Sequence, residues 1–162
     1  MALATRKQPT LRIKKGLKRE TRSQFAALCY RIKGNKVQIL LVTTRRTGRW
    51  IVPKGWPMDG KTPAECAAQE AWEEAGVEGR AQDRCLGLYS YTKNVDQETG
   101  LPCVAMVYPV RVKSLSAKYP EAKERKRKWF SLRKATQVVG EPERVSSNFV
   151  MGFSKMMVRI PA

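Results

Sequence analysis

The sequence predicts a single domain that mixes helices and strands, of the α/β or α+β class. The chain has 162 residues, and 42% of them are hydrophobic, which is enough to close one core. Short apolar runs bounded by Gly, Pro and Asn are typical of strands. One segment carries both a helix start signal and a helix stop signal. No internal repeat and no long linker divides the chain.

Residues 1–23 are expected to form a basic arm ahead of one domain at residues 24–162. The arm carries eight Lys and Arg residues against a single acid, Glu20, and almost no large apolar side chains. It is either a solubilising tail or a lid that closes on an anionic ligand.

The first strands are predicted at residues 25–32 and 37–43. The dipeptide Gly34-Asn35 between them is a tight-turn pair, so the two strands should form a β-hairpin. A short strand at residues 50–52 is stopped by Pro53, and a loop rich in Gly and Pro follows.

A helix is predicted over residues 63–75. Thr62 is a suitable N-cap, Pro63 suits the first helical position, and Glu65 completes a capping box. Gly76 supplies the left-handed conformation that ends the helix. Beyond it, strands are predicted near residues 85–92, 103–112 and 128–130. A small helix capped by Ser131 and a final helix over about 142–158 should follow.

The charge of the chain indicates an anionic partner. Lys and Arg number 32 against 14 Asp and Glu, which gives a formal net charge of +18 and a pI near 10.2. Because net charge reports the sign of a ligand and not the fold, nucleic acid, nucleotide, inositol phosphate and acidic membrane all fit at this point. The chain has no His, which excludes His-based triads and His metal sites.

The four cysteines are expected to be reduced and mostly buried. They form no Cys-x-x-Cys pair, so neither a zinc ribbon nor a redox motif fits. The N-terminus has no apolar signal-peptide core and no stretch is long enough to cross a membrane, so a cytoplasmic protein is expected.

Acidic residues are concentrated on the predicted helix. Glu70, Glu73 and Glu74 project from one face, and alanines line another face that suits close packing on a sheet. Five of the 14 acids fall within residues 65–78 of this basic chain. The cluster is either a solvated acidic face or a site for Mg²⁺ or Mn²⁺, which prefer carboxylate oxygens. A metal site surrounded by cations would be a site for phosphate.

The segment from Gly55 to Val77 resembles the signature of the Nudix hydrolases, G-x5-E-x7-R-E-U-x-E-E-x-G-U, with U apolar. The match has no gap, but Lys61 replaces the first Glu and Gln69 replaces the Arg. Since the two missing side chains are opposite in charge, their joint loss would remove an ion pair. Neither loss would leave the other charge unpaired. The resemblance implies an α/β/α sandwich around a mixed β-sheet, and divalent metal-dependent hydrolysis of nucleoside diphosphate derivatives or related pyrophosphates.

Flanking motifs resemble the diphosphoinositol polyphosphate phosphohydrolase branch of this family. They are Arg-Trp-Ile-Val-Pro at residues 49–53, Ala-Gly-Val-Glu-Gly at 75–79, Arg-Lys-Arg-Lys-Trp-Phe at 125–130, and Cys-Tyr-Arg at 29–31. This branch acts on diphosphoinositol polyphosphates and on long dinucleoside polyphosphates. The resemblance therefore implies a pyrophosphohydrolase for polyphosphorylated small molecules.

The site residues follow from this interpretation. Glu70, Glu73 and Glu74 would hold the metal with help from a backbone carbonyl near Lys54 or Gly55, and one carboxylate, such as Glu70, could accept the proton of the attacking water. Basic side chains around this helix are candidate phosphate contacts because they neutralise phosphate oxygens. These candidates are Arg45, Arg46, Arg49, Lys54, Arg125, Lys126 and Arg127.

Two other functions use the same residues. Dinucleoside polyphosphates or the 5′-triphosphate end of RNA would need a base-binding pocket, and Trp56 is either a ring for stacking or, as we favour, a loop anchor. A non-catalytic RNA-binding Nudix domain is the alternative from another class, although it would be expected to lose carboxylates. The excess of cations with only 8% aromatic residues favours a phosphate-dense small molecule.

Overall fold

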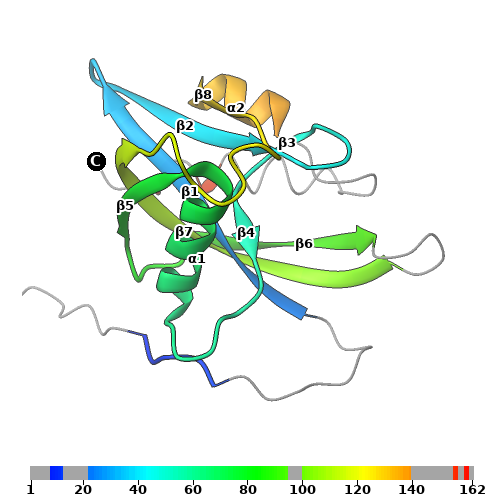
Figure 1. The fold of residues 1–162 in the computed structure, drawn as a ribbon. Coiled ribbons are helices and arrows are strands. Elements are labelled where there is room, and N and C mark those ends of the chain that lie inside the picture. The colour runs from blue at the N-terminus through cyan, green and yellow to red at the C-terminus, as the bar shows by residue number, and fades with distance from the viewer. Residues whose placement is uncertain (1–7, 13–21, 95–99, 140–154, 157–158, 161–162) are drawn as a thin grey trace, which may run out of the picture.

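The computed structural model describes residues 8–12, 22–94, 100–139, 155–156 and 159–160. Within these residues the chain forms eight strands and two helices (Figure 1). The elements are β1 (Arg22–Lys33), β2 (Lys36–Thr43), β3 (Trp50–Ile51), β4 (Lys54–Gly55), α1 (Pro63–Ala75), β5 (Val77–Ala81), β6 (Gly87–Asn94), β7 (Gly100–Leu115), β8 (Arg127–Ser131) and α2 (Leu132–Val138).

The strands form one mixed sheet. Its main path runs β3-β2-β1-β7-β5, while β4 pairs with β1, β6 pairs with β7 and β8 pairs with β2. β1 and β7 are parallel, and the other pairs are antiparallel. Because β1 and β7 are both long, this parallel pair forms the centre of the sheet, from which β4 extends toward α1 (Figure 1).

The predicted hairpin and helix are confirmed. Gly34 and Asn35 both have positive φ. A two-residue hairpin turn needs this conformation, because it matches the twist of the paired strands β1 and β2. Thr62 Oγ1 accepts a hydrogen bond from the Glu65 amide at 3.2 Å, and Glu65 Oε2 accepts one from the Thr62 amide at 2.9 Å. Gly76 ends α1 with φ of 64°. Local signals therefore set both ends of α1.

Two apolar layers cover the two faces of the sheet. On one face, Phe25, Ala27 and Cys29 of β1 pack against the alanine face of α1. On the other face, Ala26 and Leu28 belong to a second cluster that includes Ala135 of α2. Side chains alternate between the faces of a strand, so β1 supplies both cores. The predicted α/β class with a sandwich around a mixed sheet is confirmed.

Strands β4 and β5 were absent from the sequence prediction. β5 has the sequence Val-Glu-Gly-Arg-Ala, and only Val77 is buried, so no apolar alternation marks it as a strand. Its extended conformation comes from antiparallel pairing with residues 110–115 of β7. The predicted strands near residues 50–52, 85–92, 103–112 and 128–130 are confirmed with shifted ends, as is the helix after Ser131.

Other expectations concern the ends of the chain. Most of the helix predicted at 142–158 lies outside the described residues, although Lys155 and Met156 are helical. Most of the basic arm also lies outside them. Its described part, residues 8–12, runs along the loop before α1, where the Leu11 amide donates to Lys61 O at 2.8 Å (Figure 1). Leu11 also packs against the core beneath α1, so the arm does contribute an apolar side chain.

The cysteines and the lengths of the helices can also be compared with the sequence predictions. All four cysteines are free, and three of them, Cys29, Cys66 and Cys103, are buried, as predicted. No helix among the described residues combines the length and the apolar character needed to cross a bilayer.

Candidate active site

Two carboxylates of α1 are buried where the helix faces β4. Glu70 and Glu74 are one helical turn apart, so they lie on the same side of α1, and they are only 8% and 6% exposed. Glu73 is half-buried and accepts a hydrogen bond from Gln69 Nε2 at 2.9 Å. The expected three-carboxylate cluster is therefore a buried pair with a third carboxylate held beside it by Gln69.

Gly55 of β4 lies directly beneath the Glu70 carboxylate. A Cβ atom at position 55 would overlap the Glu70 side chain. The glycine at the start of the family signature is thus required for close approach of β4 to α1.

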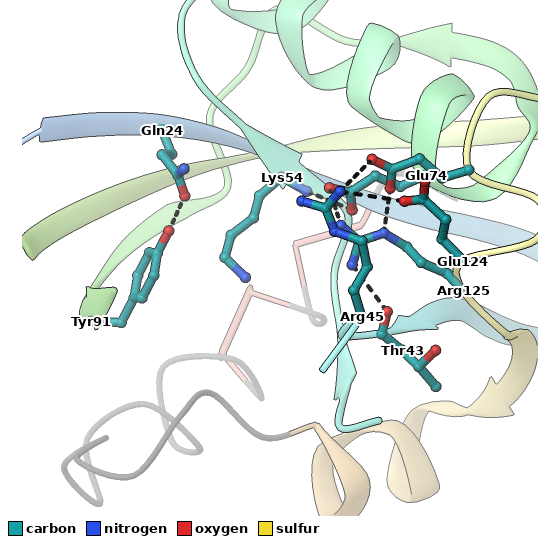
Figure 2. Close-up of polar contacts among 9 residues, drawn as sticks. Gln24, Thr43, Arg45, Lys54, Glu74, Tyr91, Glu124 and Arg125 are labelled. Carbon is teal, nitrogen blue, oxygen red and sulfur yellow. Dashed lines mark hydrogen bonds and ion pairs between the residues drawn. The ribbon is translucent and has the colours of Figure 1, made fainter. Parts of the chain in front are cut away.

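Glu74 is surrounded by hydrogen-bond donors. The Lys54 amide donates to Glu74 Oε2 at 3.4 Å, and Arg125 Nη2 lies 3.2 Å from Oε1 (Figure 2). Arg125 also donates through Nη1 to Thr43 O at 3.0 Å, and its Nε pairs with Glu121. The Arg125 side chain is 8% exposed, so its guanidinium is a largely buried link between α1, β2 and the segment before β8.

Burial raises the pKa of both carboxylic acids. Desolvation, reinforced by the neighbouring charges of Glu74, Glu73 and Glu121, raises the pKa of Glu70 to about 8. Desolvation also raises the pKa of Glu74 to about 7, against the lowering effect of Arg125 and Lys54. The site therefore contains more buried negative charge than Arg125 and Lys54 compensate, which favours an added cation or protons.

The metal role of Glu70, Glu73, Glu74 and the Gly55 carbonyl stays a prediction. Among the described residues, no group of three or more acidic or cysteine side chains is arranged to hold a metal ion. The pair Glu70 and Glu74 is present, but Glu73 points its carboxylate to Gln69, and Arg125 is the cation that contacts Glu74.

The predicted phosphate contacts lie in different places. The Arg125 guanidinium contacts the Glu74 carboxylate, and the Lys54 backbone amide donates to it, whereas the Lys54 ammonium lies 5.0 Å from the centre of the Tyr91 ring. Arg45 is 59% exposed and pairs with Glu124 at 3.3 Å, so it lies at the rim of the site. Of the other predicted phosphate contacts, Arg46 and Lys126 are exposed and Arg49 is half-buried. Arg127 donates to backbone carbonyls at the end of α1 and in the segment that follows β7.

Sequence reasoning missed Glu121. This residue pairs with Arg125, and its charge raises the pKa of both Glu70 and Glu74. It is therefore a fourth acid at the site. The available signal was the pair of acids at positions 121 and 124, immediately before the basic run.

Sequence reasoning also missed a group of cations that lie over the aromatic ring of Trp56. This group is on the face of the sheet opposite α1. Trp56 is half-buried, and Arg22 Cζ and Lys93 Nζ lie 5.9 and 4.8 Å from its ring centre. The Tyr91 hydroxyl bonds to the buried Gln24 nearby (Figure 2). Trp56 packs against the core, as the loop-anchor interpretation expects. No pattern in the sequence brings Arg22, Trp56 and Lys93 together, because they lie on different elements.

The fold and the site define an α/β/α domain that presents paired helix carboxylates beside a short strand, β4, which contains Gly55. Residues 22–149 match the NUDIX domain model, so the chain belongs to the Nudix family. It is therefore a Nudix hydrolase acting on phosphoanhydride substrates.

Similar proteins include members of two named groups. The chain is 34% identical over 125 residues to Nudix hydrolase 16, mitochondrial, of Arabidopsis thaliana, covering 75% of this chain and 68% of that protein. It is 30% identical over 120 residues to diphosphoinositol polyphosphate phosphohydrolase 3-alpha of Homo sapiens, covering 73% and 69%. It spans only 54% of Nudix hydrolase 13, mitochondrial, of A. thaliana, at 30% identity over 109 residues.

Solved structures share the fold. An Ap4A hydrolase of C. elegans in a binary complex aligns with a TM-score of 0.60 and 16% identity, covering 86% of this chain and 97% of that chain. The NUDIX domain of Shewanella oneidensis NrtR, crystallised with ADP ribose, aligns with a TM-score of 0.61 and 14% identity, covering 86% and 88%.

Proposed function

We propose that this protein is a divalent metal-dependent pyrophosphohydrolase that cleaves highly anionic small molecules such as diphosphoinositol polyphosphates. The observation that carries the proposal is the buried pair Glu70 and Glu74 beside the cations Arg125 and Lys54. Carboxylates in such a place suit a divalent cation, and cations next to them suit phosphate.

The donor atoms of these residues suit Mg²⁺ or Mn²⁺. They are carboxylate oxygens, and burial makes it costly to ionise Glu70 and Glu74 without an added cation. Glu70, Glu73 and Glu74 would hold the ion, with the backbone carbonyl of Gly55. When bound, the ion would neutralise nonbridging phosphate oxygens and lower the pKa of a coordinated water.

The side chains of this chain would do the rest of the chemistry. One carboxylate of the group, such as Glu70, would accept the proton of the attacking water. Arg125 and Lys54 would offset the charge that builds up on the leaving phosphate. Gly55 would let β4 approach α1 closely enough to bring these groups together.

The cations over Trp56 support a substrate rich in phosphate. Arg22 and Lys93 both lie over this ring, so a stacked base would have to displace one of them. Tyr91 is only 6% exposed and carries Lys54 over its ring. Phosphate groups around an inositol ring would instead contact all three cations directly. The name of the human relative is consistent with this substrate class.

The cellular location of the protein and the alternative substrates also stay predictions. A cytoplasmic location is expected from the sequence, whereas the Arabidopsis relatives are named as mitochondrial. Dinucleoside polyphosphates and triphosphorylated RNA are alternative substrates for the same carboxylates. A non-catalytic RNA-binding role is disfavoured by the retention of all three carboxylates.

A phosphate-release screen with Mg²⁺ tests the function. Substrates should include an inositol pyrophosphate, a dinucleoside pentaphosphate, nucleoside triphosphates and triphosphorylated RNA. Glu74→Gln or Glu73→Gln should lower kcat by about a hundredfold or more, because a charged ligand is lost while the shape is kept. Glu78→Gln is the matched control, since Glu78 is an exposed acid on β5. Near-normal turnover of both variants at limiting Mg²⁺ would refute the metal assignment.

A further inference from the structure

The segment between β7 and β8, residues 116–126, wraps around the C-terminal end of α1. The last carbonyls of a helix have no partners within the helix. Here the Glu121 amide donates to Glu73 O at 3.0 Å, and the Ser116 amide donates to Gly76 O at 2.8 Å. The segment thus completes the end of the helix that carries the buried carboxylates.

The side chain of Arg127, at the start of β8, connects α1 with the 116–126 segment. Its Nη1 donates to Ala75 O at 2.7 Å and to Ser116 O at 2.8 Å, and its guanidinium lies 4.8 Å from the centre of the Tyr119 ring. A positive charge at a helix C-terminus is also favoured by the helix dipole. Arg127 therefore joins α1, the 116–126 segment and β8 at one point.

Gly76 makes this arrangement possible. Its φ of 64° ends the helix, and a Cβ atom there would lie 2.7 Å from Arg127 Nη1. Only glycine leaves room for the guanidinium against the last turn of α1.

The side chains of the basic run alternate in direction. The side chains of Arg125 and Arg127 contact α1, whereas Lys126 and Lys128 are exposed. This is the alternation of an extended chain. Arg125 is only two residues from Arg127. The hydrogen bonds of Arg127 to Ala75 O and Ser116 O therefore limit the positions that Arg125 and its partner Glu121 can take.

We propose that Arg127 is a positioning residue that fixes the 116–126 segment on α1 and so holds Arg125 and Glu121 against Glu74. Its role in catalysis rests on the proposed function of Glu74 and Arg125. This role differs from the phosphate contact that the sequence predicts for Arg127, because its Nη1 donates to backbone carbonyls at the end of α1.

Arg127→Met and Arg127→Lys, with Lys128→Met as the exposed control, test the proposal. Hydrogen exchange on the metal-free protein is the first measurement. In Arg127→Met, the amides of Ser116 and Glu121 should exchange faster, while those in the β1–β7 pairing keep their protection. Arg127→Lys should be intermediate, because it retains the charge but not the planar guanidinium over Tyr119. Uniformly faster exchange across the sheet, or no change at Glu121, would overturn the proposal.

A double-mutant cycle with Arg125→Ala is the second measurement. With 5-diphosphoinositol pentakisphosphate as the probe, Arg127→Met should lower kcat/KM about tenfold in the wild-type background, and less than about threefold when Arg125 is already alanine. Equal losses in both backgrounds would show that Arg127 does not act through Arg125. If the wild-type protein does not cleave this probe, the substrate assignment fails, and the exchange measurement still decides the position of the segment.

Discussion

At the scale of single residues, the site depends on how close β4 lies to α1. Gly55 leaves space for the Glu70 carboxylate, and the Lys54 amide bonds to Glu74. Two successive residues of β4 thus contact the two buried acids. A side chain at position 55 would separate the strand from the helix, so this glycine is needed for packing and not for backbone freedom.

Gly55→Ala should destabilise the protein by about 1 to 3 kcal/mol, because the added methyl overlaps a buried carboxylate. Urea unfolding measures this cost. In a Glu70→Ala background the same substitution should cost much less, since the overlapping group is gone. Equal costs in the two backgrounds would show that Gly55 is required for another reason.

The raised pKa values predict how the stability of the metal-free protein depends on pH. Glu70 faces Glu73, Glu74, Glu121 and Arg125, and its pKa is raised from 4.5 to about 8, mainly by burial. The folded state therefore keeps protons that the unfolded state has released. This contribution to stability is complete below about pH 4.5 and is lost as pH rises through about 8.

Chemical unfolding in EDTA should accordingly show a free energy of unfolding that falls between about pH 5 and 8. Glu70→Gln should flatten this fall, whereas Glu78→Gln on the surface should retain it. Added Mg²⁺ should restore stability at the higher pH. A wild-type curve that rises over this range would contradict the assignment of buried, protonated carboxylates.

At the scale of elements, α1 carries most of the information about the site. Its caps, its buried alanine face and its acids all come from one continuous segment, Thr62 to Gly76. Of the two departures from the family signature, Gln69 belongs to this segment and Lys61 directly precedes it. Gln69 donates to Glu73, which lies one turn further along the helix. An amide can thus orient this carboxylate without a charge.

Restoring the family residues in Lys61→Glu, Gln69→Arg should leave the rate within about threefold, since the pair is expected to act structurally. Steady-state kinetics of the double variant, with each single variant as control, measures this. A change much larger than threefold would indicate that Lys61 contacts substrate or water.

At the scale of the whole molecule, the sheet brings together cations that are distant in the sequence. The net charge of +18 is spread along the chain, but Arg22, Lys54 and Lys93 are gathered beside β4 because β1, β4 and β6 belong to one sheet. The general charge attracts any polyanion, whereas under the proposed function these three cations would select one with many phosphates in a small volume.

Neutralising Arg22 and Lys93 by glutamine should raise KM for an inositol pyrophosphate about tenfold, with a smaller effect on a dinucleoside pentaphosphate. The pair Lys33→Gln, Lys36→Gln at the exposed hairpin end removes the same charge and is the control. Equal fractional changes on both substrates would defeat the substrate assignment. An RNA binder would instead lose affinity with a salt slope that grows with the number of phosphates covered.

The sequence by itself determined the elements whose signals are local. The hairpin follows from Gly34 and Asn35, and the bounds of α1 follow from Thr62, Pro63 and Gly76, because turns and caps depend on neighbouring residues. The helical spacing of Glu70 and Glu74 follows in the same way. Only the tertiary structure decided which distant residues meet them.

β5 is a strand only through its pairing with β7, and Glu121, Arg125 and Arg127 reach α1 only because the 116–126 segment folds back on it. Such contacts join residues that are tens of positions apart, so no local pattern records them. They form because sheet pairing and the end of α1 leave backbone groups and buried charges that distant residues satisfy.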